Sequence, residues 1–288
     1  MRDPDLEPVS VALAAADAAP DAVPGAVPDA VLESTMSTVD AVALSMVRGV
    51  GPVRYRELLR EHGSTCSALR VVGRAERERA RDEARRALAD AAALGARCLV
   101  LGEPAYPAPL LDLADAPPVL WALGDLALLE QPAGAIVGTR RATAHGTRAA
   151  RRLAEAAGRA GAAVVSGLAL GIDAAAHAGA LETDGGTVAV LGTGLGVVYP
   201  RANAPLRDRI REHGLLLSEL APGDAADAGS FPRRNRIIAA LARVTLVVEA
   251  PHRSGALITA EHALELGRTV AAVPGPIDVA ACAGSNQL

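Results

Sequence analysis

Residues 163–180 read AVVSGLALGIDAAAHAGA, a short β-branched run followed by a glycine-rich turn and a run of small residues with helical character. The second half of the chain repeats this alternation of short strands and helices. It predicts strands at 135–137, 163–166, 187–191, 215–218, 244–249 and 270–273, after an earlier strand at 98–101. Such alternation is typical of a parallel sheet wrapped by helices. We therefore predict an α/β fold for residues 96–288.

The region before this sheet divides into two parts. Residues 1–38 are rich in Ala, Asp and Pro and have few large apolar side chains, which predicts a disordered tail. Residues 39–95 predict a small helical domain, in which RGVGP at 48–52 joins two short helices in a helix-hairpin-helix (SAM-like) outline. Its glycines would let the turn approach a phosphate. Simple packing of two helices at a corner explains the same residues, and the sequence leaves both interpretations open.

The composition of the 288 residues excludes several classes of protein. Three widely spaced cysteines favour neither disulfides nor a zinc site, and no apolar run is long enough to span a membrane, so we expect a cytoplasmic protein without a metal or cofactor. All 29 cationic side chains are Arg, which excludes a Schiff-base or P-loop lysine. Residues 1–40 hold eight acids and one Arg, leaving 28 Arg against 25 acids. Any nucleic-acid site must therefore be a local cluster.

Candidate binding residues follow the strands, because ligands of parallel sheets bind outside the carboxyl ends of the strands. The first strand of the main domain is followed by Gly138, Thr139 and Arg140, and the next helix carries further arginines. Free amides, a hydroxyl and guanidinium groups at a helix start predict a phosphate site. An ordinary turn with solvated arginines is the alternative.

The next two strands end in glycine-rich turns. Gly167 would permit close approach of a ligand, while Asp173 is expected to cap a helix and His177 to be packed or exposed rather than catalytic. Gly192 and Gly194 belong to a Gly-x-Gly-x-Gly string that is too short for the dinucleotide fingerprint. Tyr199, which follows that string, is a candidate for stacking on a base or for filling the loop.

The most informative stretch is FPRRNRII at 231–238, which contains the only Phe of the chain. An aromatic ring beside clustered arginines suits single-stranded nucleic acid, because the cations bind the backbone and the ring stacks on a base. The candidate residues here are Phe231, Arg233, Arg234, Asn235 and Arg236. Further along, Ser254 and Gly255 open another helix and predict either an anion-binding turn or an ordinary cap.

Seven motifs taken in order resemble the DNA-processing protein A (DprA/Smf) family. They are VGTR, SGLALGID with a following Ala-His, GTGL with a following Tyr-Pro, SE, FPRRNRII, VEA with a following SG-x-L-x-TA, and VPG, and they cover about residues 98–288. The resemblance implies an extended Rossmann-like domain that binds single-stranded DNA, forms a homodimer and helps load the RecA recombinase during natural transformation and recombination, without being primarily an enzyme. It places Gly138, Thr139 and Arg140 in a phosphate-contacting turn and residues 231–236 along the DNA groove. Thr139 replaces the usual Ser of the family and keeps its hydroxyl.

The resemblance also predicts a truncated carboxyl terminus, since the chain stops at 284–288 inside a motif that continues in the family and lacks the winged-helix domain that many members carry. The main alternative is a nucleotide-processing hydrolase of related Rossmann-like architecture. Such enzymes use a Pro-Gly-Gly-x-Gly-Thr-x-x-Glu signature, which is absent here, and only Glu249 at a strand end could replace its acid.

Overall fold

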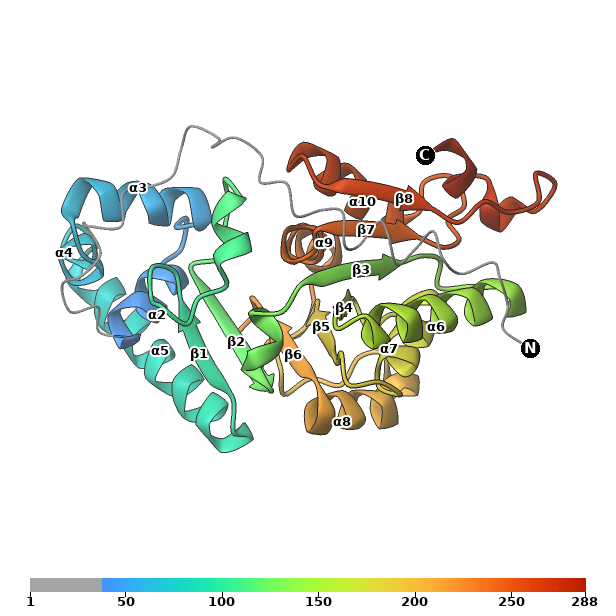
Figure 1. Ribbon diagram of the computed structural model, residues 1–288. Helices are drawn as coiled ribbons and strands as arrows, with labels where there is room; N and C mark the ends of the chain where they lie inside the picture. Colours follow the sequence, from blue (N-terminus) through green and yellow to red (C-terminus); the bar gives the residue numbers. More distant parts are fainter. Residues whose placement is uncertain (1–37) are drawn as a thin grey trace.

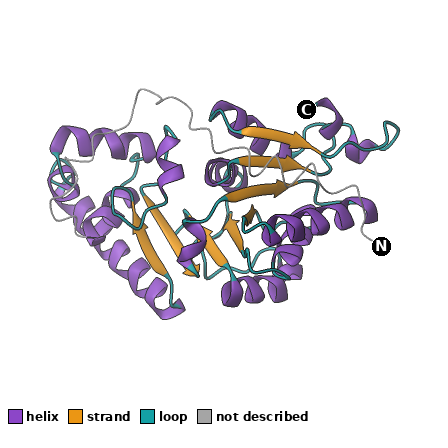
Figure 2. Ribbon diagram, viewed as in Figure 1, coloured by secondary structure: helices purple, strands orange, loops and turns teal. Residues whose placement is uncertain are grey.

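The computed structural model describes residues 38–288. The predicted disordered tail therefore lies, except for Thr38, outside the described residues. The described chain forms one sheet with helices on both faces and a group of helices at one end (Figures 1 and 2). None of the helices within residues 38–288 is long and apolar enough to cross a membrane.

The helical region contains four helices: α2 (Thr38–Met46), α3 (Pro52–His62), α4 (Thr65–Leu69) and α5 (Arg74–Leu94). The turn between α2 and α3 uses Gly49 with φ of 82°, a backbone conformation that glycine adopts without steric cost. Tyr55, Leu58 and Leu59 form the buried face of α3. This region packs directly on the sheet, because its apolar side chains share one core cluster with Trp121 and Leu216.

The sheet has eight strands in the order β1-β2-β6-β5-β4-β3-β7-β8. Their bounds are β1 (Arg97–Val100), β2 (Val119–Gly124), β3 (Ala133–Val137), β4 (Ala163–Ser166), β5 (Thr187–Leu191), β6 (Leu215–Ser218), β7 (Val244–Val247) and β8 (Thr269–Ala272). The six strands β3 to β8 are parallel, which confirms the α/β fold with a Rossmann-like sheet. The order reverses beside β3, because β4 lies on one side of it and β7 on the other.

One edge of the sheet is antiparallel, which the sequence did not predict. Strand β2 was not predicted, and it pairs antiparallel with both β1 and β6. Its run VLWALG is apolar at nearly every position and follows two prolines, so it shows no alternation of apolar and polar residues. The reason is that β2 is buried on both faces, against the helical region and against the opposite core.

Helices cover both faces of the sheet. One face carries α9 (Ser230–Leu241) and α10 (Gly255–Glu265), and the other carries α6 (Ala144–Arg159), α7 (Ile172–Ala180), α8 (Ala204–His213) and the helical region. Side chains alternate between these cores along each strand, as the pleat requires. In β4, for example, Ala163 and Val165 face α9 while Val164 faces α6 and α7. Because β3, β4 and β5 run parallel to one another, the loops that follow them lie at the same edge of the sheet.

Candidate nucleic-acid interface

The turn after β3 is held in place by Glu249, which follows β7. The Glu249 backbone carbonyl accepts a hydrogen bond of 2.7 Å from the Thr139 amide. Its carboxylate accepts a bond of 2.9 Å from the Thr143 amide and one of 2.5 Å from the Thr143 hydroxyl. Thr143 in turn caps α6, because its Oγ1 accepts from the Gly146 amide at 3.0 Å. Both oxygens of the buried Glu249 carboxylate thus fix the turn that presents Arg140.

A second buried carboxylate organises the turn after β4. Asp173 lies in the first turn of α7, and its Oδ2 accepts hydrogen bonds from the amides of Gly167 (3.1 Å) and Ala169 (3.4 Å). Burial raises the pKa of Asp173, while Arg234 and the backbone amides act in the opposite direction. Asp173 therefore accepts hydrogen bonds from the loop that precedes α7. The sequence predicted that Asp173 would cap this helix, but the cap position is occupied by Gly171. The carboxylate gives this loop a fixed shape.

His177 belongs to the same buried network. Its Nε2 accepts a hydrogen bond of 3.2 Å from the Leu168 amide, and its Nδ1 lies 2.7 Å from the Thr187 hydroxyl. Because that hydroxyl donates to the Val164 carbonyl, Nδ1 must carry the proton. Burial lowers the pKa of His177 to about 3, so the ring stays neutral at physiological pH. His177 supports the loop and does not face a ligand site.

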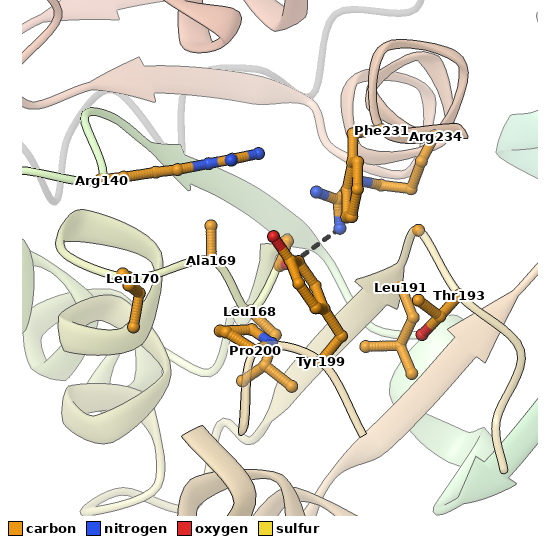
Figure 3. Close-up of a pocket in the computed structure, with 12 residues that line it drawn as sticks. Arg140, Leu168, Ala169, Leu170, Leu191, Thr193, Tyr199, Pro200, Phe231 and Arg234 are labelled. Atoms are coloured by element: carbon orange, nitrogen blue, oxygen red, sulfur yellow. Dashed lines mark hydrogen bonds between the residues drawn. The ribbon is translucent and has the colours of Figure 1, made fainter. Parts of the chain in front are cut away.

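These loops and the start of α9 enclose a pocket at the carboxyl edge of the sheet (Figure 3). Arg140, Leu170 and Tyr199 are exposed at its mouth, and the Phe231 ring is half-buried. The two ring centroids lie 5.2 Å apart with an interplanar angle of 43°, and Arg140 Cζ lies 5.5 Å from the Phe231 centroid. Gly192 makes room for this arrangement, since a Cβ there would stand 2.5 Å from the Phe231 ring. A cation and two aromatic faces thus share one concave surface.

Arg234 forms the inner wall of this pocket. The residue is only 6% exposed, and its Nη1 donates hydrogen bonds to the carbonyls of Gly167 (2.7 Å) and Val190. Burial lowers the pKa of Arg234 to about 10, which still leaves the guanidinium charged at neutral pH. These hydrogen bonds connect α9 to the ends of β4 and β5, so the main role of Arg234 is structural. Its charge also adds positive potential beneath the pocket.

Comparison with known proteins identifies the family to which this sheet and pocket belong. The family model described as DNA recombination-mediator protein A matches residues 97–288. The chain belongs to this family. Protein Smf of Synechocystis sp. is 47% identical over 190 residues, which cover 65% of this chain and 48% of that protein. DNA processing protein DprA of Streptococcus pneumoniae is 47% identical over 172 residues, which cover 60% of this chain and 61% of that protein. The matched region thus spans about half to three fifths of these relatives.

Solved structures from the recombination-mediator family have the same fold. The X-ray structure of DNA processing protein A from Streptococcus pneumoniae matches with a TM-score of 0.77 and 33% identity, covering 88% of this chain and 92% of that one. A structure of DNA processing protein A from Helicobacter pylori matches with a TM-score of 0.61 and 31% identity, covering 66% of this chain and 85% of that one. The Helicobacter protein is described as having a unique single-stranded DNA binding mode.

In this member of the recombination-mediator family, the arginines of FPRRNR do not converge on one site. Arg236 is 5% exposed and lies outside the pocket, bound to the Asp115 carboxylate and the Glu219 carboxylate at 2.8 Å each. Arg233 is exposed and pairs with Asp227 at 2.9 Å. The structure contradicts a common phosphate clamp made of Arg233, Arg234 and Arg236, because each guanidinium has a separate set of partners.

The remaining predicted residues divide between lining the pocket and supporting it. Thr139 is buried beside Arg140, and Gly138 is packed so tightly that a Cβ there would meet Ile172. Gly194 lies under the loop at 221–224 and donates its amide to the Asp224 carbonyl. Two residues lie at the start of α10: Ser254 caps that helix, and the Gly255 carbonyl accepts a bond of 3.0 Å from Asn235. Neither Ser254 nor Gly255 lines the pocket.

The sequence did not point to Asn203, which shapes the pocket of this family member. Asn203 donates from Nδ2 to the carbonyls of Leu168 (2.9 Å) and Ala169 (3.1 Å), which fixes the loop after β4. No local pattern around Asn203 points to this contact, because its partners lie more than thirty positions earlier in the chain. Within residues 38–288, no group of three or more His, Cys, Asp or Glu side chains could hold a metal ion.

Proposed function

We propose that this chain binds single-stranded DNA in the pocket formed by Arg140, Tyr199, Phe231 and the loops after β4 and β5. The observation that carries the proposal is the placement of the Arg140 guanidinium over one side of Phe231 while Tyr199 lies beside the same ring. A guanidinium binds a phosphate and an aromatic face binds an unstacked base, which is how proteins hold single strands without reading sequence. Bases within a duplex cannot reach such a face without unpairing.

The single-stranded DNA binding mode described for the Helicobacter protein supports the same ligand class. Family membership further supports a role in DNA uptake and recombination, including loading of RecA and action as a homodimer. The hydrolase alternative gains no support from Glu249, because both its carboxylate oxygens already bind Thr143.

The proposal is tested by measuring binding to single-stranded and duplex oligonucleotides of equal length across a salt series. We expect the single strand to bind more tightly at every salt concentration, with little dependence on its base sequence. Equal or tighter binding of the duplex would contradict the proposal.

Replacing Arg140 with alanine should remove one phosphate contact. We expect the slope of log affinity against log salt for single-stranded DNA to fall by about 0.7. The control is Arg85→Ala, which removes an arginine paired with Asp82 on the exposed face of α5 and should leave the slope unchanged. If Arg140→Ala retains the parental affinity and slope, the strand is bound elsewhere.

A further inference from the structure

Helix α6 continues the basic surface beyond the pocket. Residues 140–153 contain five arginines and one histidine but no acid. Arg141 and Arg148 are exposed, and within residues 38–288 neither of them has an acidic partner at salt-bridge distance. Arg151 and Arg159, further along the same helix, both pair with Glu155. The arginines toward the end of α6 therefore share an acidic partner, whereas Arg141 and Arg148 have none within residues 38–288.

The geometry of the helix brings the uncompensated arginines near the pocket. The buried side of α6 includes Gly146, Ala150 and Ala154, which leaves Arg148 on the solvent side. Side chains of an α-helix lean toward its N-terminus, so Arg148 covers the turn that precedes it. Arg141 lies just before the Thr143 cap of this turn and is adjacent in sequence to Arg140, which reaches into the pocket (Figure 3). Arg141 and Arg148 together form what we call the basic track.

The basic track has no counter-charge at the start of its own helix. Cations near a helix N-terminus oppose the helix dipole, α6 has no acidic residue in its first turn, and the buried Glu249 carboxylate at this helix start is already bound to Thr143. A polyanion that passes over this surface would remove the repulsion and release counterions. A single phosphate bound at Arg140 would not, because it would leave Arg141 and Arg148 without a partner.

We propose that the basic track binds the backbone of nucleotides that leave the pocket, so that one single strand runs from Phe231 over the start of α6. The inference rests on the proposed function, because it concerns the continuation of the strand bound in the pocket. Arg141 and Arg148 would bind phosphates of a long strand, and a short oligonucleotide confined to the pocket has no phosphates at these positions.

Oligonucleotide length separates the basic track from the pocket. Salt-dependent affinity is measured for a thymidine oligonucleotide of about 4 nucleotides and for one of about 16, the range of site sizes seen for single-strand binding folds. For the double variant Arg141→Ala/Arg148→Ala we expect the salt slope for the longer strand to fall by about 1.4, which corresponds to two lost phosphate contacts. The slope for the shorter strand should stay at the parental value.

The matched control is Arg151→Ala/Arg159→Ala, which removes two arginines from the same helix that are already paired with Glu155. This control should leave both slopes unchanged, and thermal unfolding should show that both double variants are folded. Unchanged slopes for Arg141→Ala/Arg148→Ala, or equal losses for the two lengths, would overturn the basic track. A lower slope for Arg141→Ala/Arg148→Ala together with a parental slope for Arg140→Ala would instead contradict the proposed pocket. Failure of the basic track and failure of the pocket therefore give different results.

Discussion

Replacing Arg236 with alanine is expected to lower the free energy of unfolding by about 3 kcal/mol, the low end of the cost of breaking a buried ion pair. The low end applies because the Arg236 side chain is 6% exposed, whereas Asp115 and Glu219 are 46% and 25% exposed and regain some hydration. Arg236 also donates to the Asp115 backbone carbonyl and so joins α9 to the loop before β2. Urea unfolding of the variant and the parent measures the difference.

The control for this prediction is Arg233→Ala on the same helix. Its ion pair with Asp227 is exposed on both sides, so we expect a much smaller loss of stability than for Arg236→Ala. If Arg236→Ala does not fold, Asp115→Asn offers a milder disruption of the same contact and should still destabilise more than Arg233→Ala. A variant of Arg236 with parental stability and a salt slope lowered by about 0.7 would restore the phosphate role that the sequence predicted.

Replacing Phe231 with alanine is expected to weaken binding of single-stranded DNA by about 1–3 kcal/mol, or roughly 5- to 150-fold. The salt slope should remain close to the parental value, because stacking releases no counterions. This combination distinguishes Phe231 from Arg140, whose loss is expected to change the slope. Fluorescence anisotropy across a salt series gives both quantities from one experiment.

Phe231→Tyr serves as the control, because it keeps an aromatic face at the same position and should bind within a few-fold of the parent. The Phe231 ring also packs on Gly192, so the thermal unfolding of Phe231→Ala must match that of the parent before its affinity is interpreted. Parental affinity of a folded Phe231→Ala variant would show that the base stacks elsewhere, with Tyr199 as the next ring to test.

The sequence alone was enough to predict most of the strands and the turns that follow them. The predicted strands at 163–166, 187–191 and 215–218 coincide with β4, β5 and β6. Short runs of β-branched residues or leucine between turn residues favour a buried strand. The ordered motifs predicted the family, and the family model confirms it over residues 97–288. Phe231 and Arg140 were both candidates from local composition, and the structure places both in one pocket.

Tertiary structure decided what each arginine does. Successive residues of a helix point about 100° apart, so neighbours in FPRRNR cannot all face one ligand once α9 begins at Ser230. Arg234 consequently turns inward to the ends of β4 and β5, Arg236 turns to Asp115 and Glu219, and Arg233 remains at the surface. Their partners come from distant parts of the chain, and only the packing of α9 on the sheet selects them. The sequence determined which groups were available for binding, whereas long-range contacts determined which of them support the pocket and which face it.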